Sequence, residues 1–318
     1  MKPLVLALVG PTASGKSDWA LKFAQKIPSS VIAADSRTVY RGLNIGTAKI
    51  TQDHQSSQTN SPHGPVYNIQ NVPHYGLDLA DPNEMYAVGK FQTFVNNLLP
   101  TLWRAGRLPI LVGGTGLYVE AVLAGYHLPA QAELPVEFKH STTVELIKKL
   151  SQIDPETASH IDPRNRVRIE RALAYTLVQK KSFLKNQKKQ RPIFQSRLYV
   201  IDRPRAELYR RNDARVEAWT RGQLFSEVRK FLDQGVPRVR IQEFGLIYKL
   251  ALEHVEGVIA LEEFRTQLQG RLHAYVRRQL TWWRRNPAVH WVRNYATFEA
   301  DAYDWLAKEG ECLQLLHP

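Results

Sequence analysis

Length and composition limit what this chain can be: its 318 residues, 43% hydrophobic and 23% charged, suffice for one large α/β domain or for a main domain with a smaller second one. No stretch approaches the roughly 20 apolar residues of a membrane span, so we expect a protein that stays off membranes. The only cysteine, Cys312, excludes an internal disulfide, which fits a reducing, cytoplasmic compartment. We also expect a monomer. The net charge of +13 favours polyanionic partners.

The first 130 residues alternate between apolar runs and segments with helical spacing. Leu4–Val9, Val31–Ala34 and Leu108–Val112 are short apolar runs followed by glycine or aspartate, as buried parallel strands often are. Gly15–Ile27 and Phe91–Arg104 have helical spacing. This alternation predicts a parallel sheet with helices on both faces. The side chains expected to pack inward from the first helix are Trp19, Leu21, Phe23, Ala24 and Ile27.

The rest of the chain is predicted to be mostly helical. Thr51–Val66 is polar and contains Pro62, Gly64 and Pro65, which predicts a mobile surface loop. Leu198–Asp202 and Val289–Val292 are predicted to be strands that rejoin the sheet. We therefore expect an α/β core of residues 1–129 and 196–318, with a helical insertion at 130–195. The predicted helices are Val144–Leu150, Arg166–Val178, Ala206–Trp219, Gln223–Leu232, Glu243–Val255 and Leu261–Trp283.

A phosphate-binding motif follows the first predicted strand. Gly10–Ser17 reads Gly-Pro-Thr-Ala-Ser-Gly-Lys-Ser and matches G-x-x-x-x-G-K-[ST], between a strand and a helix as the motif requires. Backbone N–H groups and the helix N-terminus would cradle phosphate oxygens, Lys16 would add a cation, and the Ser17 hydroxyl suits Mg²⁺. The motif predicts a fold like that of P-loop NTPases and identifies a phosphate without identifying a reaction.

Asp35 ends the second predicted strand, at the sheet edge where open α/β sheets bind ligands. It can be a general base or substrate anchor, a Mg²⁺ ligand of the NTPase type, or a turn residue. Its neighbours in Asp35–Thr38, together with Lys49, favour substrate contact. The glycines of Gly113–Gly116, behind the third strand, either admit a ligand close to the backbone or form a plain strand-to-helix turn.

Basic residues concentrate in two regions. Residues 162–215 hold 16 Lys/Arg and 5 Asp/Glu, and residues 265–285 hold 6 Lys/Arg and no acidic residue. Such clustering is typical of nucleic-acid-binding faces, and a solvated basic face is the alternative. Trp282 and Trp283 could stack on bases, although we expect at least one of them in the core. The arginines at helical spacing are Arg164, Arg166, Arg168, Arg171, Arg211 and Arg215.

Taken together, these segments resemble the tRNA dimethylallyltransferase (tRNA isopentenyltransferase) family over nearly the whole chain. Gly10–Ser17 is similar to its G-P-T-A-S-G-K-[ST], Asp35–Gly42 to its D-S-R-Q-V-Y-R-G, and Ile45–Lys49 to its I-G-T-A-K. Leu111–Tyr118 and Arg278–Trp282 match later motifs of the family. The chain departs from the family's pattern at Thr38, Tyr75, Ile247–Lys249 and Leu272-His273, and in its long loop after residue 50.

The resemblance implies that a dimethylallyl group moves from its diphosphate to the exocyclic amine of the adenosine just 3′ of the anticodon. Lys16, Arg215 and Mg²⁺ would neutralise the leaving diphosphate, and Asp35 would accept the proton of the amine or orient the amine. The insertion would bind the anticodon stem-loop. The diphosphate residues are Gly10, Thr12, Ala13, Ser14, Gly15, Lys16, Ser17 and Arg215. The tRNA residues are Asp35, Ser36, Arg37, Thr38, Thr115, Phe138, Arg168 and Arg171.

Three other functions remain open from the sequence. A small-molecule kinase could use ATP at the same phosphate loop, but it would not require the basic insertion. A catalytically weak tRNA-binding relative would fit the C-terminal departures. Prenyl transfer to free adenine nucleotides would not require 16 basic residues in 162–215.

Overall fold

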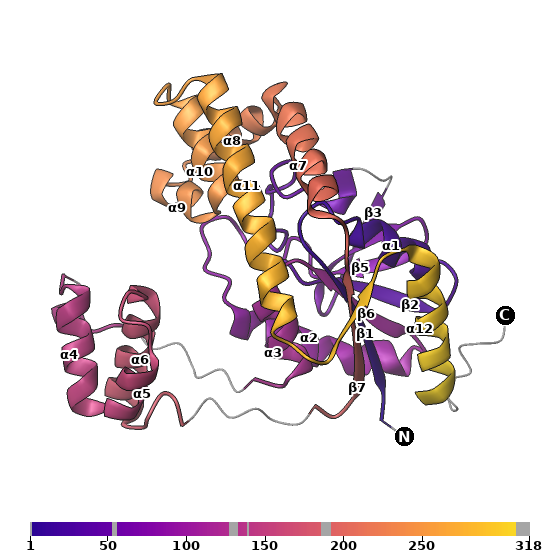
Figure 1. Ribbon diagram of the computed structural model, residues 1–318, viewed down its shortest axis with the longest axis horizontal. Coiled ribbons are helices and arrows are strands. Elements are labelled where there is room, and N and C mark those ends of the chain that lie inside the picture. Colours follow the sequence, from indigo (N-terminus) through magenta and orange to yellow (C-terminus); the bar gives the residue numbers. More distant parts are fainter. Residues whose placement is uncertain (1, 53–55, 127–132, 139, 186–191, 310–318) are drawn as a thin grey trace. The chain divides into compact units, whose positions relative to one another are not determined.

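The computed structural model describes residues 2–52, 56–126, 133–138, 140–185 and 192–309, which form two compact units (Figure 1). One unit comprises Met1–Val119 with Ile193–Pro318, and the other comprises Glu120–Pro192. Each unit has a hydrophobic core of its own. Within the described ranges, no helix combines the length and the apolar character needed to cross a membrane.

The first unit is built on one eight-stranded sheet with the strand order β3-β4-β5-β2-β6-β1-β7-β8. The pairs from β5 to β8 are all parallel, whereas β3, β4 and β5 pair in antiparallel fashion. The fully parallel part confirms the predicted α/β class. The strands are β1 Leu4–Val9, β2 Ser29–Ala33, β3 Ser56–Ser61, β4 Gly64–Ile69, β5 Val72–Tyr75, β6 Leu108–Gly113, β7 Gln195–Ile201 and β8 Val289–Val292.

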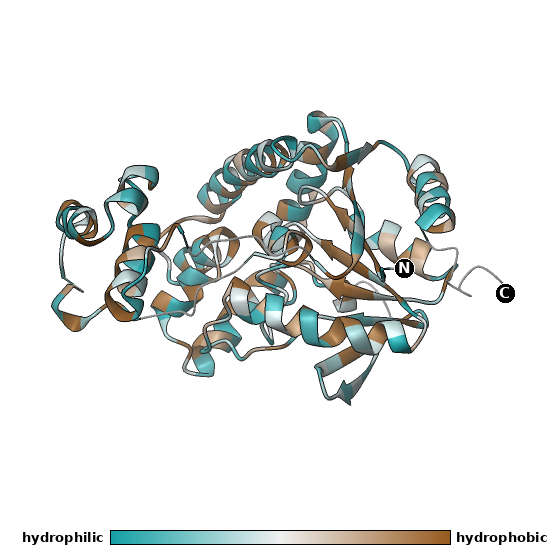
Figure 2. Cartoon of the chain, turned by 90° about the horizontal axis from the view of Figure 1, so that it is seen from below, coloured by the Kyte–Doolittle hydropathy of each residue, from teal (hydrophilic) through white to brown (hydrophobic). Residues whose placement is uncertain are grey.

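Both faces of the central strands are covered. All six residues of β1 are buried, so successive side chains on opposite faces are equally shielded from water. On one face α1 (Lys16–Ala24) and α12 (Tyr295–Glu309) pack against Leu4, Leu6 and Leu8 in a single apolar cluster. The strands are mostly brown in the hydropathy colouring of Figure 2, as expected for a buried parallel sheet. The side chains predicted to pack inward from the first helix, Trp19, Leu21, Phe23, Ala24 and Ile27, are all buried.

The remaining helices of the first unit include α2 (Val88–Arg104), which contacts β6, and a C-terminal group that packs together (Figure 1). Leu208, Val276 and Leu280 form an apolar cluster between α7 and α11. A short helix, α3 (Gly116–Leu123), crosses the boundary between the two units. The C-terminal group consists of α7 Arg205–Thr220, α8 Gln223–Asp233, α9 Arg238–Glu243, α10 Leu246–Val255 and α11 Leu261–Arg284.

The second unit is helical. It contains the 3-10 helix η2 (Val136–Phe138) and the helices α4 (Thr143–Ile153), α5 (Pro155–His160) and α6 (Arg166–Gln179). Thr142 and Glu145 form a capping box at the start of α4, and an apolar cluster that includes Leu146, Leu150, Ile169 and Leu173 forms its core. The insertion expected at residues 130–195 overlaps this unit, and its proposed role in binding tRNA stays a prediction.

The loop predicted for Thr51–Val66 is wrong. After the 3-10 helix η1 (Ile50–Gln52), β3 and β4 form an antiparallel hairpin that β5 continues. The Ser61–Gly64 turn closes the hairpin, because the Ser61 hydroxyl donates to the Gly64 carbonyl at 2.9 Å and accepts from the His63 N–H at 3.1 Å. Since β3 is polar, largely exposed and at the sheet edge, it has no buried apolar face that the sequence could reveal.

The other predicted elements agree with the structure except for small shifts at their ends. The strands predicted at Leu198–Asp202 and Val289–Val292 do join the sheet, where β7 pairs with β1 and β8 pairs with β7. The helix predicted at Glu243–Val255 is interrupted, because α9 ends at Glu243 and α10 begins at Leu246. Between them Gly245 has a φ of 108°, which a helix does not permit.

Candidate functional site

The phosphate loop leads from β1 directly into α1. Lys16 is the first residue of α1, so the N-terminus of this helix and its free N–H groups lie at the loop. The Lys16 ammonium donates to the Pro11 carbonyl at 3.5 Å. This hydrogen bond is long and therefore weak, so a bound anion could readily replace it. The loop therefore combines backbone donors, a helix dipole and a cation, as an anion-binding site requires.

Arginines from α7 and from the chain before it border the phosphate loop. The Arg215 guanidinium donates to the Thr12 hydroxyl at 3.4 Å. The Arg203 guanidinium donates to the Ser14 carbonyl at 2.6 Å and is paired with Glu207, which also pairs with Arg211. Arg203 therefore holds the loop in place, whereas the hydrogen bond from Arg215 to Thr12 is long enough for a phosphate oxygen to replace it.

The pKa of Lys16 is lower than that of an ordinary lysine. Burial lowers its pKa from the ordinary 10.5 to about 8, and the neighbouring Arg215 charge acts in the same direction. The Asp35 and Asp18 carboxylates oppose this effect and keep the pKa from falling further. A charged ligand with two or more negative charges would stabilise the protonated form, because it would neutralise the excess positive charge at the loop.

Asp35 lies just past the carboxyl end of β2, beside a turn that fixes its side chain. Its Oδ1 accepts the Arg37 N–H at 2.8 Å, and the Ser36 N–H donates to the Thr115 hydroxyl at 3.1 Å. The latter bond ties the end of β2 to the segment that follows β6. Asp35 Oδ2 takes no part in these bonds, so the carboxylate keeps an oxygen for a further donor.

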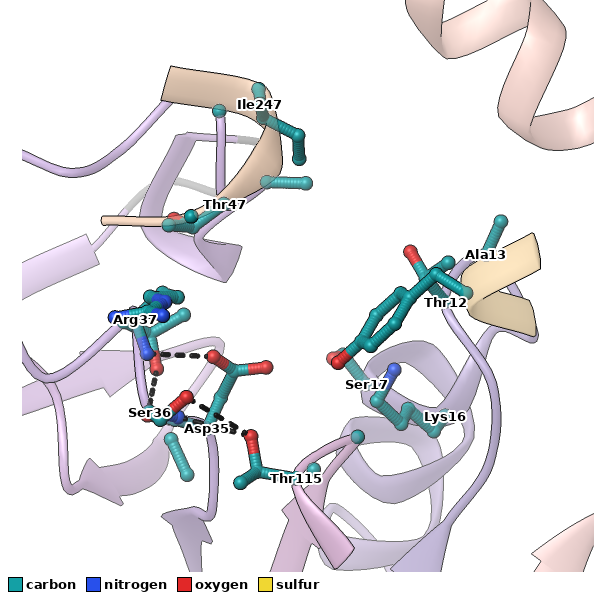
Figure 3. Close-up of a pocket in the computed structure, with 18 of the residues that line it drawn as sticks. Thr12, Ala13, Lys16, Ser17, Asp35, Ser36, Arg37, Thr47, Thr115 and Ile247 are labelled. Atoms are coloured by element: carbon teal, nitrogen blue, oxygen red, sulfur yellow. Dashed lines mark hydrogen bonds between the residues drawn. The ribbon is translucent and has the colours of Figure 1, made fainter. Parts of the chain in front are cut away.

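One cavity of about 460 Å³ joins these elements (Figure 3). Lys16 and Ser17 border it from α1, and Asp35 and Thr115 border it from the ends of β2 and β6. In Figure 3 the Asp35 carboxylate and the Lys16 ammonium extend into the same space from opposite sides, and Thr47 and Ile247 cover one edge. Its lining is partly charged and partly apolar, which suits a ligand with an anionic end and an apolar end.

Residues 38–286 match the sequence profile of the family described as IPP transferase. The chain belongs to this family. It is 35% identical to the tRNA dimethylallyltransferase 1 of Trichlorobacter lovleyi, with 96% of this chain and all of that protein covered. The tRNA dimethylallyltransferase of Chloroflexus aggregans is 34% identical, with 95% of this chain and 98% of that protein covered.

Solved structures of IPP transferases have the same fold. The tRNA isopentenylpyrophosphate transferase of Bacillus halodurans is 31% identical and superposes with a TM-score of 0.68, with 98% of this chain and 97% of that chain covered. A eukaryotic dimethylallyltransferase acting on tRNA shares the fold at 21% identity, with a TM-score of 0.72 over 88% of this chain and 69% of that one. The predicted family and the P-loop-like fold are therefore confirmed.

Most residues predicted for the transferase site line the cavity. Gly10 and Ser14 do not: the Ser14 side chain is fully buried, and a Cβ on Gly10 would meet the Ser14 hydroxyl at 2.8 Å. Of Phe138, Arg168 and Arg171, which belong to the second unit, Phe138 packs against that unit's core and the two arginines are exposed on α6. The predicted residues that line the cavity are Thr12, Ala13, Gly15, Lys16, Ser17, Asp35, Ser36, Arg37, Thr38, Thr115 and Arg215.

Two glycines at the end of β6, Gly113 and Gly114, lie close to other parts of the chain. A Cβ on Gly113 would lie 1.9 Å from the Ala34 carbonyl oxygen, and a Cβ on Gly114 would lie 2.7 Å from the Gln279 amide nitrogen. Gly113 therefore requires glycine for packing, whereas a Cβ on Gly114 would meet only the far end of the Gln279 side chain. This geometry favours the plain structural interpretation for Gly113, and both glycines line the cavity.

Two residues that shape the cavity were given no role by the sequence. Glu227 of α8 is buried, and its carboxylate accepts the N–H groups of Asn44, Ile45 and Gly46 together with the Tyr248 hydroxyl. It thereby fixes the loop whose Gly46 lines the cavity. The other is Gln279, which bonds to the phosphate loop. Gln279 lies within Arg278–Trp282, which matches a motif of the family, whereas nothing near Glu227 in the sequence indicates its partners.

The described residues contain no group of three or more His, Cys, Asp or Glu arranged for a metal ion. Oxygen donors do line the cavity, however: the Ser17 hydroxyl and the carboxylates of Asp18 and Asp35. Hydroxyl and carboxylate oxygens are ligands that Mg²⁺ accepts, and Mg²⁺ commonly takes most of its remaining ligands from water and substrate phosphates. The donor set is thus compatible with a magnesium ion held mainly by a bound diphosphate.

Proposed function

We propose that this chain transfers a dimethylallyl group from dimethylallyl diphosphate to the exocyclic amine of an adenosine in tRNA. The observation that carries this proposal is the single cavity in which the phosphate loop faces Asp35 across a partly apolar space. A phosphate site alone would fit many reactions. The names of the full-length relatives point to prenyl transfer onto tRNA.

The part of the cavity that binds the diphosphate must stabilise the negative charge that develops on this leaving group. As the allylic C–O bond breaks, the bond electrons leave with the diphosphate, and Lys16 of the phosphate loop and Arg215 of α7 would stabilise the charge. The Ser17 hydroxyl and the diphosphate oxygens would hold Mg²⁺, which when bound neutralises part of the same charge. The apolar lining, including Ile247 and Leu272, would surround the five-carbon group.

The acceptor side needs a group that receives one proton. The adenine amine forms a bond to the allylic carbon, and its nitrogen then carries an extra proton and a positive charge. Asp35 would accept that proton through its free carboxylate oxygen. Thr115 supports this arrangement, because its hydroxyl binds the Ser36 N–H next to Asp35. Ser36, Arg37 and Thr38 would contact the base and its backbone at the same edge of the cavity.

The acceptor is proposed to be the adenosine 3′-adjacent to the anticodon. Bases in an anticodon loop are already unpaired, so one of them can enter a pocket without the cost of opening a duplex. The net charge of +13 and the exposed Arg168 and Arg171 on α6 suit the phosphates of the anticodon stem. The cytoplasmic location and the monomeric state stay predictions.

A labelling experiment tests this function against its alternatives. The protein is incubated with label in the prenyl group of dimethylallyl diphosphate or in the γ-phosphate of ATP, and with tRNA or AMP as acceptor. The proposal expects label in tRNA from the prenyl donor alone. Label passing from ATP would indicate a kinase, label in AMP a free-nucleotide prenyltransferase, and tRNA binding without transfer a catalytically weak relative.

A further inference from the structure

Gln279 occupies a position between the two loops that form the cavity. It lies on α11 and is only 6% exposed. Its amide oxygen accepts the Thr12 N–H at 2.9 Å, and its amide nitrogen donates to the Gly114 carbonyl at 3.0 Å. One side chain therefore bridges the phosphate loop after β1 and the glycine segment after β6.

The chemistry of these contacts is specific to a primary amide. Thr12 offers a donor and Gly114 offers an acceptor, so the bridging group must accept on one side and donate on the other. A glutamate would accept twice, and its charge would repel the Gly114 carbonyl. A leucine would leave both backbone groups buried without partners. The close approach also depends on Gly114, where a Cβ would lie 2.7 Å from the Gln279 nitrogen.

The two bridged loops carry the two sides of the proposed reaction. Thr12 belongs to the phosphate loop, and its hydroxyl is held separately by Arg215 of α7. Gly114 precedes Thr115, whose hydroxyl binds the Ser36 N–H beside Asp35. Gln279 thus connects the diphosphate side of the cavity to the adenosine side through a short chain of hydrogen bonds.

We propose that Gln279 is a positioning residue that sets the distance between the diphosphate subsite and the adenosine subsite. This inference rests on the proposed transfer. Gln279 lines the cavity, but its amide is bonded to the two loops, so we assign it no contact with a reacting atom. It acts by holding the phosphate loop, with its Lys16, at a fixed separation from Asp35. Reactions between two bound substrates are sensitive to such spacing, and a misplacement of about 1 Å costs on the order of 100-fold in rate.

The proposal predicts a loss of rate without a loss of affinity. Gln279→Ala should lower the single-turnover rate of prenyl transfer roughly 10- to 100-fold, while the dissociation constants for dimethylallyl diphosphate and for tRNA, each measured alone, change by no more than about threefold. Gln267→Ala is the matched control, since Gln267 lies on the same helix and its side chain bonds, among the described residues, to Glu263 and Arg271. It should leave the rate and both affinities unchanged.

A double-mutant cycle separates positioning from general destabilisation. Gly114→Ala should also slow transfer, because the added methyl pushes the Gln279 amide away. In the Gln279→Ala background the shorter side chain removes that collision, so Gly114→Ala should then have little further effect on the rate. Effects on the rate that multiply independently would overturn the proposal, as would unchanged turnover in Gln279→Ala.

The same experiments distinguish a failure of the positioning role of Gln279 from a failure of the proposed prenyl transfer. If the wild type transfers no prenyl group to tRNA, the proposed function fails whatever the variants do. If the wild type is active and Gln279→Ala melts at a lower temperature but turns over normally per folded molecule, the function stands and the positioning role is wrong. A loss of affinity for both substrates that equals the loss of rate would likewise contradict it.

Discussion

At the scale of single residues, Asp35 carries the most specific chemical expectation. Asp35→Asn keeps the size and shape of the side chain but cannot accept a proton at neutral pH. We expect transfer to fall by about 10²- to 10⁴-fold, the usual contribution of a general base, while both substrates still bind. Steady-state turnover and tRNA binding measure this, with the exposed Asp233→Asn as the control.

Two other roles for Asp35 give different results with the same variant. A magnesium-binding Asp35 predicts a defect that is partly repaired by raising the Mg²⁺ concentration. A purely structural Asp35 predicts a lower melting temperature with nearly normal activity per folded molecule. Folded, tRNA-binding protein with undiminished turnover would remove Asp35 from the mechanism.

Lys16 predicts a pH dependence. Because its pKa lies at about 8, the side chain is protonated below that pH and loses its charge above it in the free protein. The neutral form attracts diphosphate less, so kcat/KM for dimethylallyl diphosphate should fall as the pH rises through about 8. Lys16→Ala should be slower by roughly 10²- to 10³-fold and should lose this dependence. A wild-type profile that stays flat well above pH 8 would contradict the assignment.

Sequence alone could identify residues that belong to a local motif, but it could not identify those that act across the fold. Lys16 and Asp35 were recognisable because a strand, a turn and a helix surround them in the chain. Glu227 holds the N–H groups of Asn44 and Ile45, more than 180 residues away. Its partners are backbone atoms of a distant loop, so no side-chain pattern near Glu227 could predict them.

At the scale of elements, burial decides which strands the sequence reveals. β1 and β6 are buried along their whole length, and their apolar runs predicted them correctly. The β3–β4 hairpin was mistaken for a loop because β3 is polar and exposed, and because Pro62 and Gly64 are typical of loops as well as of hairpin turns. The hairpin is joined to the sheet by backbone hydrogen bonds between β4 and β5. Such bonds leave no recognisable pattern of side chains in a polar sequence.

The Asp154 carboxylate accepts hydrogen bonds from several segments of the second unit. Asp154, at the junction of α4 and α5, accepts from the Thr157 hydroxyl at 2.5 Å, the Phe183 N–H at 2.8 Å and the Ser182 hydroxyl at 3.0 Å. Burial by itself raises the pKa of Asp154, but these hydrogen bonds outweigh it and hold the pKa below the ordinary value. The ionised form is therefore stabilised in the folded unit.

Asp154→Asn should consequently destabilise the second unit in a pH-dependent manner. The stabilisation is fully present above the unfolded-state pKa of about 4 and is lost as the pH falls through the lower folded-state pKa. We expect a cost of about 1–3 kcal/mol at neutral pH that shrinks in acid, since the variant no longer satisfies the buried donors as well. Hydrogen exchange of residues 143–185 in urea measures it, with the exposed Glu137→Gln as control. A difference that persists unchanged in acid would rule out the carboxylate as its cause.

At the scale of the whole molecule, net charge predicts how the two substrates respond to salt. With a net charge of +13 and 16 basic residues in 162–215, tRNA affinity should fall steeply between low and moderate salt, because binding releases counterions from the RNA backbone. Affinity for dimethylallyl diphosphate should fall much less, since it involves few phosphates. Parallel binding titrations of both substrates test this, and a salt-independent tRNA dissociation constant would refute the nucleic-acid interpretation of the basic regions.

In the proposed reaction the cavity brings a diphosphate donor together with an adenine amine in an anticodon loop. The most direct measurement compares two anticodon stem-loop RNAs that differ only in the base 3′ of the anticodon, adenosine in one and inosine in the other, each incubated with the wild-type protein and dimethylallyl diphosphate labelled in its prenyl group. Inosine carries a carbonyl oxygen in place of the amine. We expect label in the adenosine loop, on that one nucleoside after digestion, and none in the inosine loop. Equal labelling of both loops, or no labelling of the adenosine loop, would contradict it.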